Sequence, residues 1–126
     1  MTELTQKILI RAMSVEDLVQ IVAIEREATP SPWSGKQFEQ SLQQHHCLVM
    51  RGTEGDSNSV VGYAIVSSLL DQAEVLNICI NPEYQGAGFG SQLLTHVLKQ
   101  LPDDIDVVYL DVRVSNFRAI HLYQNH

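Results

Sequence analysis

The chain has 126 residues and is short of several residue types, and each shortage excludes a class of protein. Two cysteines, Cys47 and Cys79, are too few for a disulfide-stabilised scaffold, and because both fall in apolar, strand-like runs we expect buried free thiols. No apolar run approaches the ~20 residues that a membrane-spanning helix needs. The first residues also lack a basic segment followed by an apolar one, so we expect no secretory signal and a cytoplasmic protein.

Basic residues are scarce as well. The chain has 8 Lys and Arg against 15 Asp and Glu, which gives a net charge of −7. This balance argues against nucleic acid or an anionic membrane as the main partner, and it favours a cationic partner. The charge alone names no substrate.

The 5 histidines do not form a metal-binding pattern. His45 and His46 are adjacent, so in an extended chain their side chains face opposite ways and cannot share a metal ion. His96, His121 and His126 have no partner at the spacing of metal ligands. We therefore predict no metal site.

Apolar residues make up 44% of the chain, which is enough for the core of one domain but not of two. The apolar patterns predict, in order, a strand at 8–12, helices after Ser14 and Ser34, strands at 48–51, 60–70 and 73–80, a helix after Gly90, a strand at 107–114 and a last helix from Asn116. This order predicts an α/β (α+β) fold with a central, mixed, mostly antiparallel sheet flanked by helices.

The most informative stretch of the sequence leads from a buried strand into a helix. Its strand-like run at 75–80 is apolar and β-branched, and Pro82 ends it. From Leu93 onward the apolar residues follow helical spacing instead. The loop between the two elements must therefore bend tightly.

Three glycines, Gly86, Gly88 and Gly90, remove side chains from this loop where it enters the helix. Free backbone N–H groups at the start of a helix suit an anion such as a phosphate. Ser91 stands where the dinucleotide fingerprint needs a third glycine, and no Gly-Lys-Ser/Thr follows, so two better-known phosphate loops are excluded. The alternative is a loop whose glycines serve tight packing only.

The loop Gln85–Gly90 resembles the Q/R-x-x-G-x-G/A loop that grips the pyrophosphate of acetyl-coenzyme A in the GCN5-related N-acetyltransferases (GNAT). Over almost the whole chain the sequence also resembles the bacterial ribosomal-protein-alanine N-acetyltransferases. Matching segments are 77–85, 110–116, 119–123 and 32–34 with Phe38. The resemblance implies the GNAT-type fold, one acetyltransferase domain over residues 1–126, acetyl-coenzyme A as acetyl donor, and an acceptor amine at the N-terminus of a basic protein, such as Ala of a ribosomal protein.

The resemblance also implies roles for individual residues. Asp111 corresponds to the carboxylate base that deprotonates the amine, Tyr123 to the acid that protonates the leaving thiolate, and Trp33 to a wall of the acceptor site. The implied cofactor-binding residues are Ile78, Cys79, Ile80, Gln85, Gly86, Ala87, Gly88, Phe89, Gly90, Ser91 and Asn116. From the residues alone other roles stay open: Asp111 as an ion-pair partner of Arg113, Trp33 as a core aromatic, and Tyr123 as an aromatic that packs beneath the cofactor.

Two features depart from the family pattern. Asp111 is one methylene shorter than the usual Glu, which leaves a water-mediated contact open. The chain stops at His126 inside the last predicted helix, so we expect a C-terminally incomplete domain without the last two strands, with an exposed sheet edge at 107–114 and dimerisation through that edge. Three other functions stay open: an acetyltransferase for polyamines, aminoglycosides or other small amines, a non-catalytic acyl-coenzyme A-binding remnant, and a purely structural domain.

Overall fold

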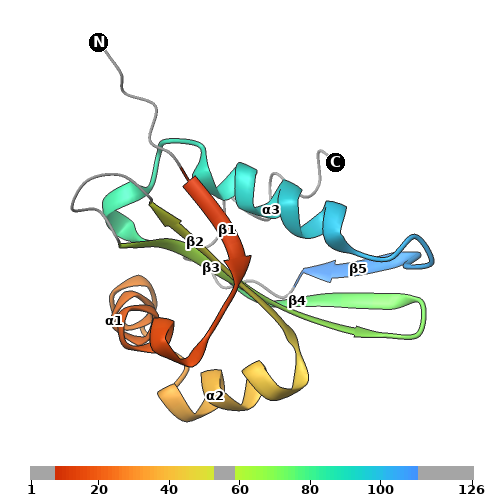
Figure 1. The fold of residues 1–126 in the computed structure, drawn as a ribbon, viewed down its shortest axis with the longest axis horizontal. Helices are drawn as coiled ribbons and strands as arrows, with labels where there is room; N and C mark the ends of the chain where they lie inside the picture. The colour runs from red at the N-terminus through yellow and green to blue at the C-terminus, as the bar shows by residue number, and fades with distance from the viewer. Residues whose placement is uncertain (1–7, 53–58, 111–126) are drawn as a thin grey trace.

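The computed structural model describes residues 8–52 and 59–110. Its elements follow one another in the predicted order (Figure 1). They are β1 (Ile8–Ala12), the 3-10 turn η1 (Val15–Asp17), α1 (Leu18–Ala28), α2 (Gly35–Gln44), β2 (His46–Gly52), β3 (Val60–Leu69), β4 (Gln72–Ile80), the 3-10 turn η2 (Pro82–Tyr84), α3 (Phe89–Gln100) and β5 (Val107–Leu110). The end of the predicted strand 107–114 and the predicted last helix lie outside the described residues.

Local sequence signals begin the helices. Ser34 caps α2, because its Oγ accepts a hydrogen bond from the Gln37 N–H at 3.2 Å while the Gln37 side chain accepts one from the Ser34 N–H at 2.8 Å. After Ser14 the chain first makes the single turn η1, and α1 begins only at Leu18. The predicted helix therefore begins with a tighter turn than its apolar spacing indicated.

The strands form one five-stranded sheet in the order β1-β2-β3-β4-β5. The first four pair antiparallel, although only β2–β3 and β3–β4 are joined by short connections and η1, α1 and α2 lie between β1 and β2; β5 pairs parallel to β4. This parallel pair is possible because α3 carries the chain across between the two strands. The mixed, mostly antiparallel sheet that the sequence predicted is confirmed.

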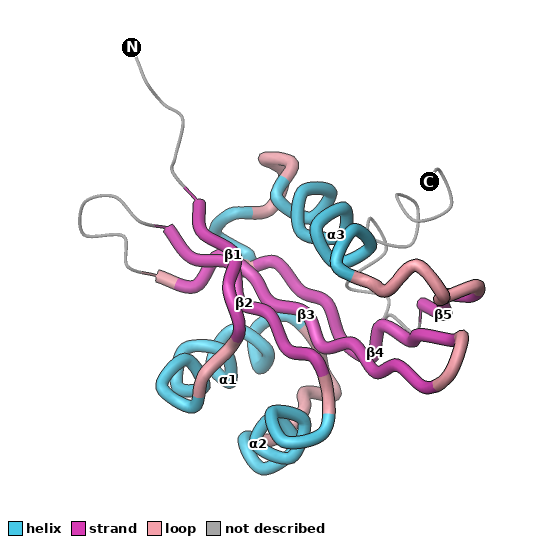
Figure 2. Tube along the Cα trace, turned by 45° about the vertical axis from the view of Figure 1, so that its right-hand side comes forward, coloured by secondary structure: helices cyan, strands magenta, loops and turns pink. Residues whose placement is uncertain are grey.

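Helices cover the sheet on both faces. In Figures 1 and 2, α1 and α2 lie on one face and α3 lies on the other. Each face has its own apolar core: Ile21, Phe38 and Tyr63 are fully buried beneath α1 and α2, and Met50 and Leu93 are fully buried beneath α3. The sheet is therefore the middle of three layers.

A bulge in β4 interrupts the regular alternation of side chains. Ile65 of β3 lies opposite Asn77 while Val66 lies opposite Val75, so Leu76 is the extra residue of β4. Leu76 packs on the α1 and α2 core, and the Asn77 side chain also points to that face, where it contacts α1. The bulge thus places two consecutive side chains on the same side of the sheet.

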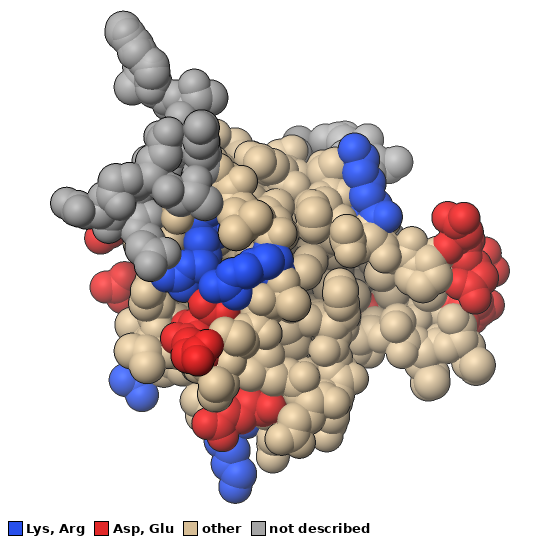
Figure 3. All heavy atoms as spheres, in the orientation of Figure 1, with Lys and Arg blue, Asp and Glu red and all other residues tan. Residues whose placement is uncertain are grey.

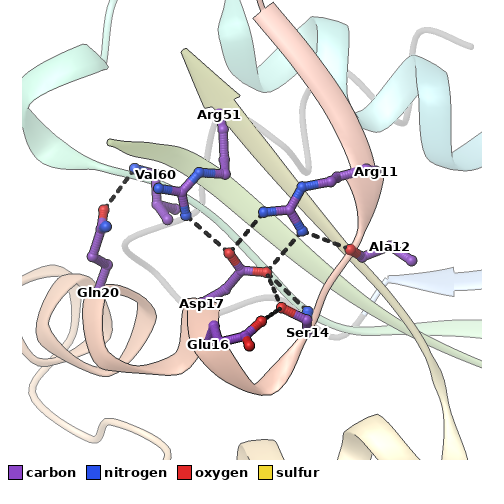
Figure 4. A network of polar contacts seen from close by, with 8 residues as sticks. All are labelled: Arg11, Ala12, Ser14, Glu16, Asp17, Gln20, Arg51 and Val60. Carbon is purple, nitrogen blue, oxygen red and sulfur yellow. Dashed lines mark hydrogen bonds and ion pairs between the residues drawn. The ribbon is translucent and has the colours of Figure 1, made fainter. Parts of the chain in front are cut away.

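A buried carboxylate joins the first turn to two strands (Figure 4). Asp17 Oδ1 forms ion pairs with Arg11 Nη2 of β1 and Arg51 Nη1 of β2, both at 2.9 Å, and its Oδ2 accepts from the Ser14 N–H at 2.8 Å. Burial by itself raises the pKa of Asp17, but the hydrogen bonds from Arg11 and Ser14 and the two Arg charges outweigh burial and hold that pKa below its ordinary value. At neutral pH this network stabilises the contact of η1 with β1 and β2.

Both cysteines are buried free thiols, as predicted. Burial raises the pKa of Cys47 to about 11, so this thiol is protonated and unreactive at neutral pH. None of the described helices is long and apolar enough to cross a membrane. Within 8–52 and 59–110, no three His, Cys, Asp or Glu side chains are grouped so that they could hold a metal ion.

Candidate functional site

The end of β4 is fixed before the glycine-rich loop begins. Asn81 does this with both ends of its side chain: its Oδ1 accepts from the Glu83 N–H at 3.0 Å, and its Nδ2 donates to the Val60 carbonyl at 3.0 Å. Its own N–H donates to the Val61 carbonyl at 2.8 Å. Pro82 then begins η2, whose first N–H would lack a partner in any case. The loop therefore leaves the sheet from a well-defined point.

Two of the loop glycines have a backbone conformation that other residues rarely adopt. Gly86 has φ of 89° and Gly88 has φ of 87°, both in the left-handed region. A Cβ added at either position would meet no heavy atom within 4 Å. The glycines are therefore required by the backbone conformation and not by packing, and the space in front of them is open. The reading that they serve tight packing only loses its basis at these two positions.

The first backbone N–H groups of α3 have no hydrogen-bond acceptor among the described residues. Gly88 is the N-cap of this helix, and the first hydrogen bond runs from the Gln92 N–H to the Gly88 carbonyl at 3.2 Å. Within the part of the chain that the structure describes, the N–H groups of Phe89, Gly90 and Ser91 donate to no acceptor. Because the positive end of the helix dipole lies behind these donors, they form a site that suits phosphate groups.

Side chains hold the loop from both of its ends. Gln85 Nε2 donates to the Ile80 carbonyl at 3.1 Å, so this side chain bridges the base of the loop. The Tyr84 and Ser59 hydroxyls lie 2.8 Å apart, and the Tyr84 ring packs edge-on against Phe89 with centroids 6.2 Å apart. Such bracing keeps the backbone donors in place without a bound ligand.

The backbone of β4 has a described partner on one side only near its end. Ile78, Cys79 and Ile80 pair with β3, whereas the described pairing with β5 ends at Val75 and Leu110. Ile78 and Ile80 point to the α3 core and Cys79 to the α1 and α2 core. Among the described residues, no strand pairs with the second side of 78–80, and the role of these residues in binding the donor stays a prediction.

Trp33 lies between α1 and α2 and is partly buried. Its ring packs on Phe38 at a centroid distance of 5.3 Å, and Phe38 packs edge-on against Tyr63 at 5.8 Å. The backbone N–H of Trp33 donates to Glu25 Oε2 at 3.0 Å. Trp33 is thus attached to the core without being enclosed by it, so both readings of this residue remain consistent with its contacts.

Glu25 was not among the predicted site residues. It lies on the apolar face of α1 in helical spacing with Leu18 and Ile21, and it is 1% exposed. A charged residue in an apolar stripe is the signal that could have found it. By contrast, Asp111, Asn116 and Tyr123 lie outside the described residues, so the catalytic pair and the further cofactor contact stay predictions.

Comparisons with known proteins agree on one family. A model of the acetyltransferase (GNAT) family matches residues 18–126. The [ribosomal protein bS18]-alanine N-acetyltransferase of Escherichia coli K12 is 34% identical to this chain over 117 residues, which are 92% of this chain and 77% of that protein. The protein of the same name from Haemophilus influenzae is 35% identical over 109 residues, which are 86% of this chain and 72% of that protein.

A solved structure supports the same relation. The crystal structure of the ribosomal-protein-S18-alanine N-acetyltransferase from Escherichia coli matches this fold with a TM-score of 0.78 and 30% identity, over 94% of this chain and 76% of that chain. The family match and these relatives therefore place the chain among the acyl-group transferases. The chain belongs to the GNAT family of acetyltransferases. The predicted family, fold class and enzyme class, an acetyl-coenzyme A-dependent acyltransferase, are confirmed.

Proposed function

We propose that this chain transfers the acetyl group of acetyl-coenzyme A to the N-terminal amine of a protein, with an N-terminal Ala of a ribosomal protein as acceptor. The observation that carries the donor is the set of N–H groups of Phe89, Gly90 and Ser91 at the start of α3, which have no acceptor among the described residues and directly follow the open loop at Gly86 and Gly88. The acceptor is supported by the names of relatives that are 34% and 35% identical over most of this chain.

The residues present fit the donor. The N–H groups at the start of α3 would hold its pyrophosphate, and Gly86 and Gly88 leave the space that the phosphates need. Backbone groups of Ile78–Ile80 would hold the pantetheine arm along the edge of β4. When bound, acetyl-coenzyme A supplies an activated thioester. Trp33 would line the acceptor side.

The reaction moves protons off the amine nitrogen and onto the leaving thiolate. An α-amine with an ordinary pKa near ~8 is mostly protonated at neutral pH, so it must lose a proton before it attacks the thioester carbonyl. We assign this step to Asp111. Backbone N–H groups at the end of β4 would stabilise the oxyanion that forms when the amine adds to the thioester carbonyl, and Tyr123 gives a proton to the leaving thiolate. The second proton that the nitrogen loses as the amide forms restores the Tyr123 hydroxyl. The products are an N-acetylated peptide and coenzyme A.

Charge supports a basic acceptor. Acidic side chains gather at the end of the molecule where the α3–β5 loop meets the β3–β4 turn, at the right of Figure 3. Asp71, Asp103, Asp104 and Asp106 are exposed there, and the Asp106 N–H donates to the Asp71 carbonyl at 2.7 Å. Negative charge of this kind attracts a basic protein.

The remaining expectations about the whole chain are also part of this proposal. Residues 1–126 form one acetyltransferase domain, and the protein acts in the cytoplasm without a nucleic-acid, membrane or metal partner. The homodimer that the sequence predicts, through the sheet edge at 107–114, is part of the same proposal. Light scattering at micromolar concentration tests the dimer, and a monomeric mass would contradict it.

Calorimetric titration of the full chain with acetyl-coenzyme A, followed by thiol release with an Ala-starting basic peptide, tests the function. Binding with release, and mass spectrometry that places the acetyl group on the N-terminus, is the expected result. An N-terminally blocked peptide and spermidine are the controls, and turnover of spermidine alone would identify a small-amine acetyltransferase. Tyr123→Phe should lower turnover ~100-fold or more while acetyl-coenzyme A still binds. Binding without any release would indicate a non-catalytic domain.

A further inference from the structure

Glu25 is the most deeply buried carboxylate of the described chain. It is 1% exposed, between α1 and the sheet. Removing a carboxylate from water is costly unless hydrogen bonds replace the lost hydration. The contacts that this residue makes therefore deserve a functional explanation.

Three donors from three segments converge on the two oxygens of Glu25. The Tyr63 hydroxyl of β3 donates to Oε1 at 2.7 Å, and the backbone N–H of Trp33 donates to Oε2 at 3.0 Å. The Asn77 amide of β4 lies between them, with Nδ2 at 3.2 Å from Oε1 and 3.3 Å from Oε2. Burial raises the pKa of Tyr63 well above its ordinary value, so its hydroxyl keeps the proton that it donates.

These contacts connect two parts of the candidate site. Trp33 belongs to the loop 29–34 between α1 and α2, and Asn77 directly precedes the strand end 78–80. Among the described residues, the other hydrogen bonds of the loop run to α1, to α2 or within the loop itself. The loop is thus tied to the sheet by hydrogen bonds through the Glu25 carboxylate.

The bulge in β4 makes this connection possible. In a regular strand, Leu76 and Asn77 would point to opposite faces. Because Leu76 is an extra residue, both point to the α1 and α2 face, and the Asn77 amide reaches Glu25. A bulge next to a candidate site that redirects one side chain is a feature with a purpose more often than a defect.

We propose that Glu25 is a positioning residue for the acceptor: it fixes the Trp33 loop relative to the end of β4 and so sets where the acceptor amine lies against the thioester. This inference rests on the proposed function, in which Trp33 lines the acceptor side and β4 holds the donor. A carboxylate suits the task because both of its oxygens accept, whereas the amide of Gln has one acceptor oxygen. In a Glu25→Gln chain, either the backbone N–H of Trp33 or the Tyr63 hydroxyl loses its acceptor.

Steady-state kinetics of the full chain, varying the Ala-starting peptide at saturating acetyl-coenzyme A, test the proposal. Glu25→Gln should raise the peptide KM roughly tenfold, as expected for the loss of one hydrogen bond to a charged group. Binding of acetyl-coenzyme A should stay within about twofold of wild type. Glu27→Gln is the matched control, since Glu27 is exposed on the same helix and the charge change is the same. It should change neither quantity.

Trp33 supplies a second readout, because it is the single tryptophan of the chain. In Glu25→Gln its fluorescence emission should shift to longer wavelength and become more accessible to acrylamide, whereas Glu27→Gln should match wild type. A folded Glu25→Gln chain with unchanged peptide KM and unchanged emission would overturn the proposal. Failure of the proposed function would give a different result, because wild type itself would then release no thiol. In that case the Trp33 emission of Glu25→Gln alone would test whether Glu25 positions the Trp33 loop.

A milder variant serves if Glu25→Gln does not fold. Tyr63→Phe keeps the ring packed on Phe38 but removes one donor to the carboxylate. The peptide KM should rise roughly threefold, the loss expected for one neutral donor. An unchanged KM in a folded Tyr63→Phe chain would contradict the proposal.

Discussion

The two faces of the sheet are built from different chemistry. Beneath α3 the buried side chains of the core are all apolar. The buried polar side chains of the described residues, which are Asp17, Glu25, Thr29, Ser41 and Asn77, lie on η1, α1, the loop after α1, α2 and the β4 bulge. Apolar contacts stabilise without fixing direction, whereas hydrogen bonds are directional. The α3 face therefore supports an anion site made of backbone groups, and the α1 and α2 face holds side chains in fixed positions.

The largest effect should come from the backbone site on the α3 face. Gly88→Val places a β-branched residue at φ of 87° and fills the open space in front of the helix. We expect acetyl-coenzyme A affinity to fall at least ~100-fold, or about 3 kcal/mol. Calorimetry measures the affinity, and circular dichroism checks that the chain is folded.

Gly35 offers the control for this variant. It lies at the start of α2 on the other face, and an added Cβ would lie 3.8 Å from Val22 Cγ2, an ordinary contact. Gly35→Ala should therefore bind acetyl-coenzyme A like wild type. Equal losses in both variants would mean that glycine replacement unfolds the chain and that the anion site has no special role.

The next effect concerns packing on the α3 face. A Cβ at Gly62 would lie 2.6 Å from Ile80 Cδ1 and 2.7 Å from the Cys79 carbonyl, so Gly62→Ala must push β3 and β4 apart. We expect the free energy of unfolding to fall by about 2 kcal/mol. Urea unfolding of the two proteins measures it. An unchanged midpoint would show that the Ile80 side chain moves aside freely.

A smaller effect is expected from the second buried carboxylate on the α1 and α2 side. Asp17→Asn removes the charge that pairs with Arg11 and Arg51. Because Arg11 is partly exposed, we expect a loss of about 1–2 kcal/mol in the free energy of unfolding. The peptide KM should not change, since the described hydrogen bonds of the Asp17 side chain run to Arg11, Ser14 and Arg51 and not to the Trp33 loop. A raised peptide KM would mean that polar groups on this face act together and not through Glu25 alone.

The same variant predicts a pH dependence. The folded pKa of Asp17 lies below its ordinary value, so its stabilisation is present above the unfolded pKa near ~4 and is lost as pH falls through the folded pKa. The difference in unfolding free energy between wild type and Asp17→Asn should therefore be constant at neutral pH and shrink below about pH 4. A difference that stays constant down to pH 2 would contradict the assignment.

The smallest effect should come from Cys47. Burial raises its pKa to about 11, so the folded chain should react with a thiol reagent at pH 8 far more slowly than the urea-unfolded chain. Absorbance of the released reagent measures both rates, and comparison with Cys47→Ala assigns the signal. Rapid labelling of the Cys47 thiol in the folded chain would show that this layer opens more readily than its buried hydrogen bonds indicate.

Much of the fold and of the donor site could be predicted from residues close together in the chain. The glycine loop is an example, because the left-handed backbone at Gly86 and Gly88 and the free donors at 89–91 depend on local conformation alone. The α2 cap at Ser34 is local in the same sense. The start of α1 was predicted less accurately, because the turn η1 precedes this helix and Asp17 is held by Arg51 of the distant strand β2.

The tertiary structure alone decided the rest. Glu25 meets Tyr63 across 38 positions and Asn77 across 52, and no local pattern specifies such pairs. The sequence does not reveal the bulge at Leu76 either, because 73–80 is predicted as one strand with no glycine or proline to mark an irregularity. By itself, the sequence determined which segments form helices, strands and the glycine loop, since propensity and spacing act over a few residues. Which side chains meet was decided by the register of the sheet and the packing of α1 on it, since a shift of one residue turns every side chain to the other face.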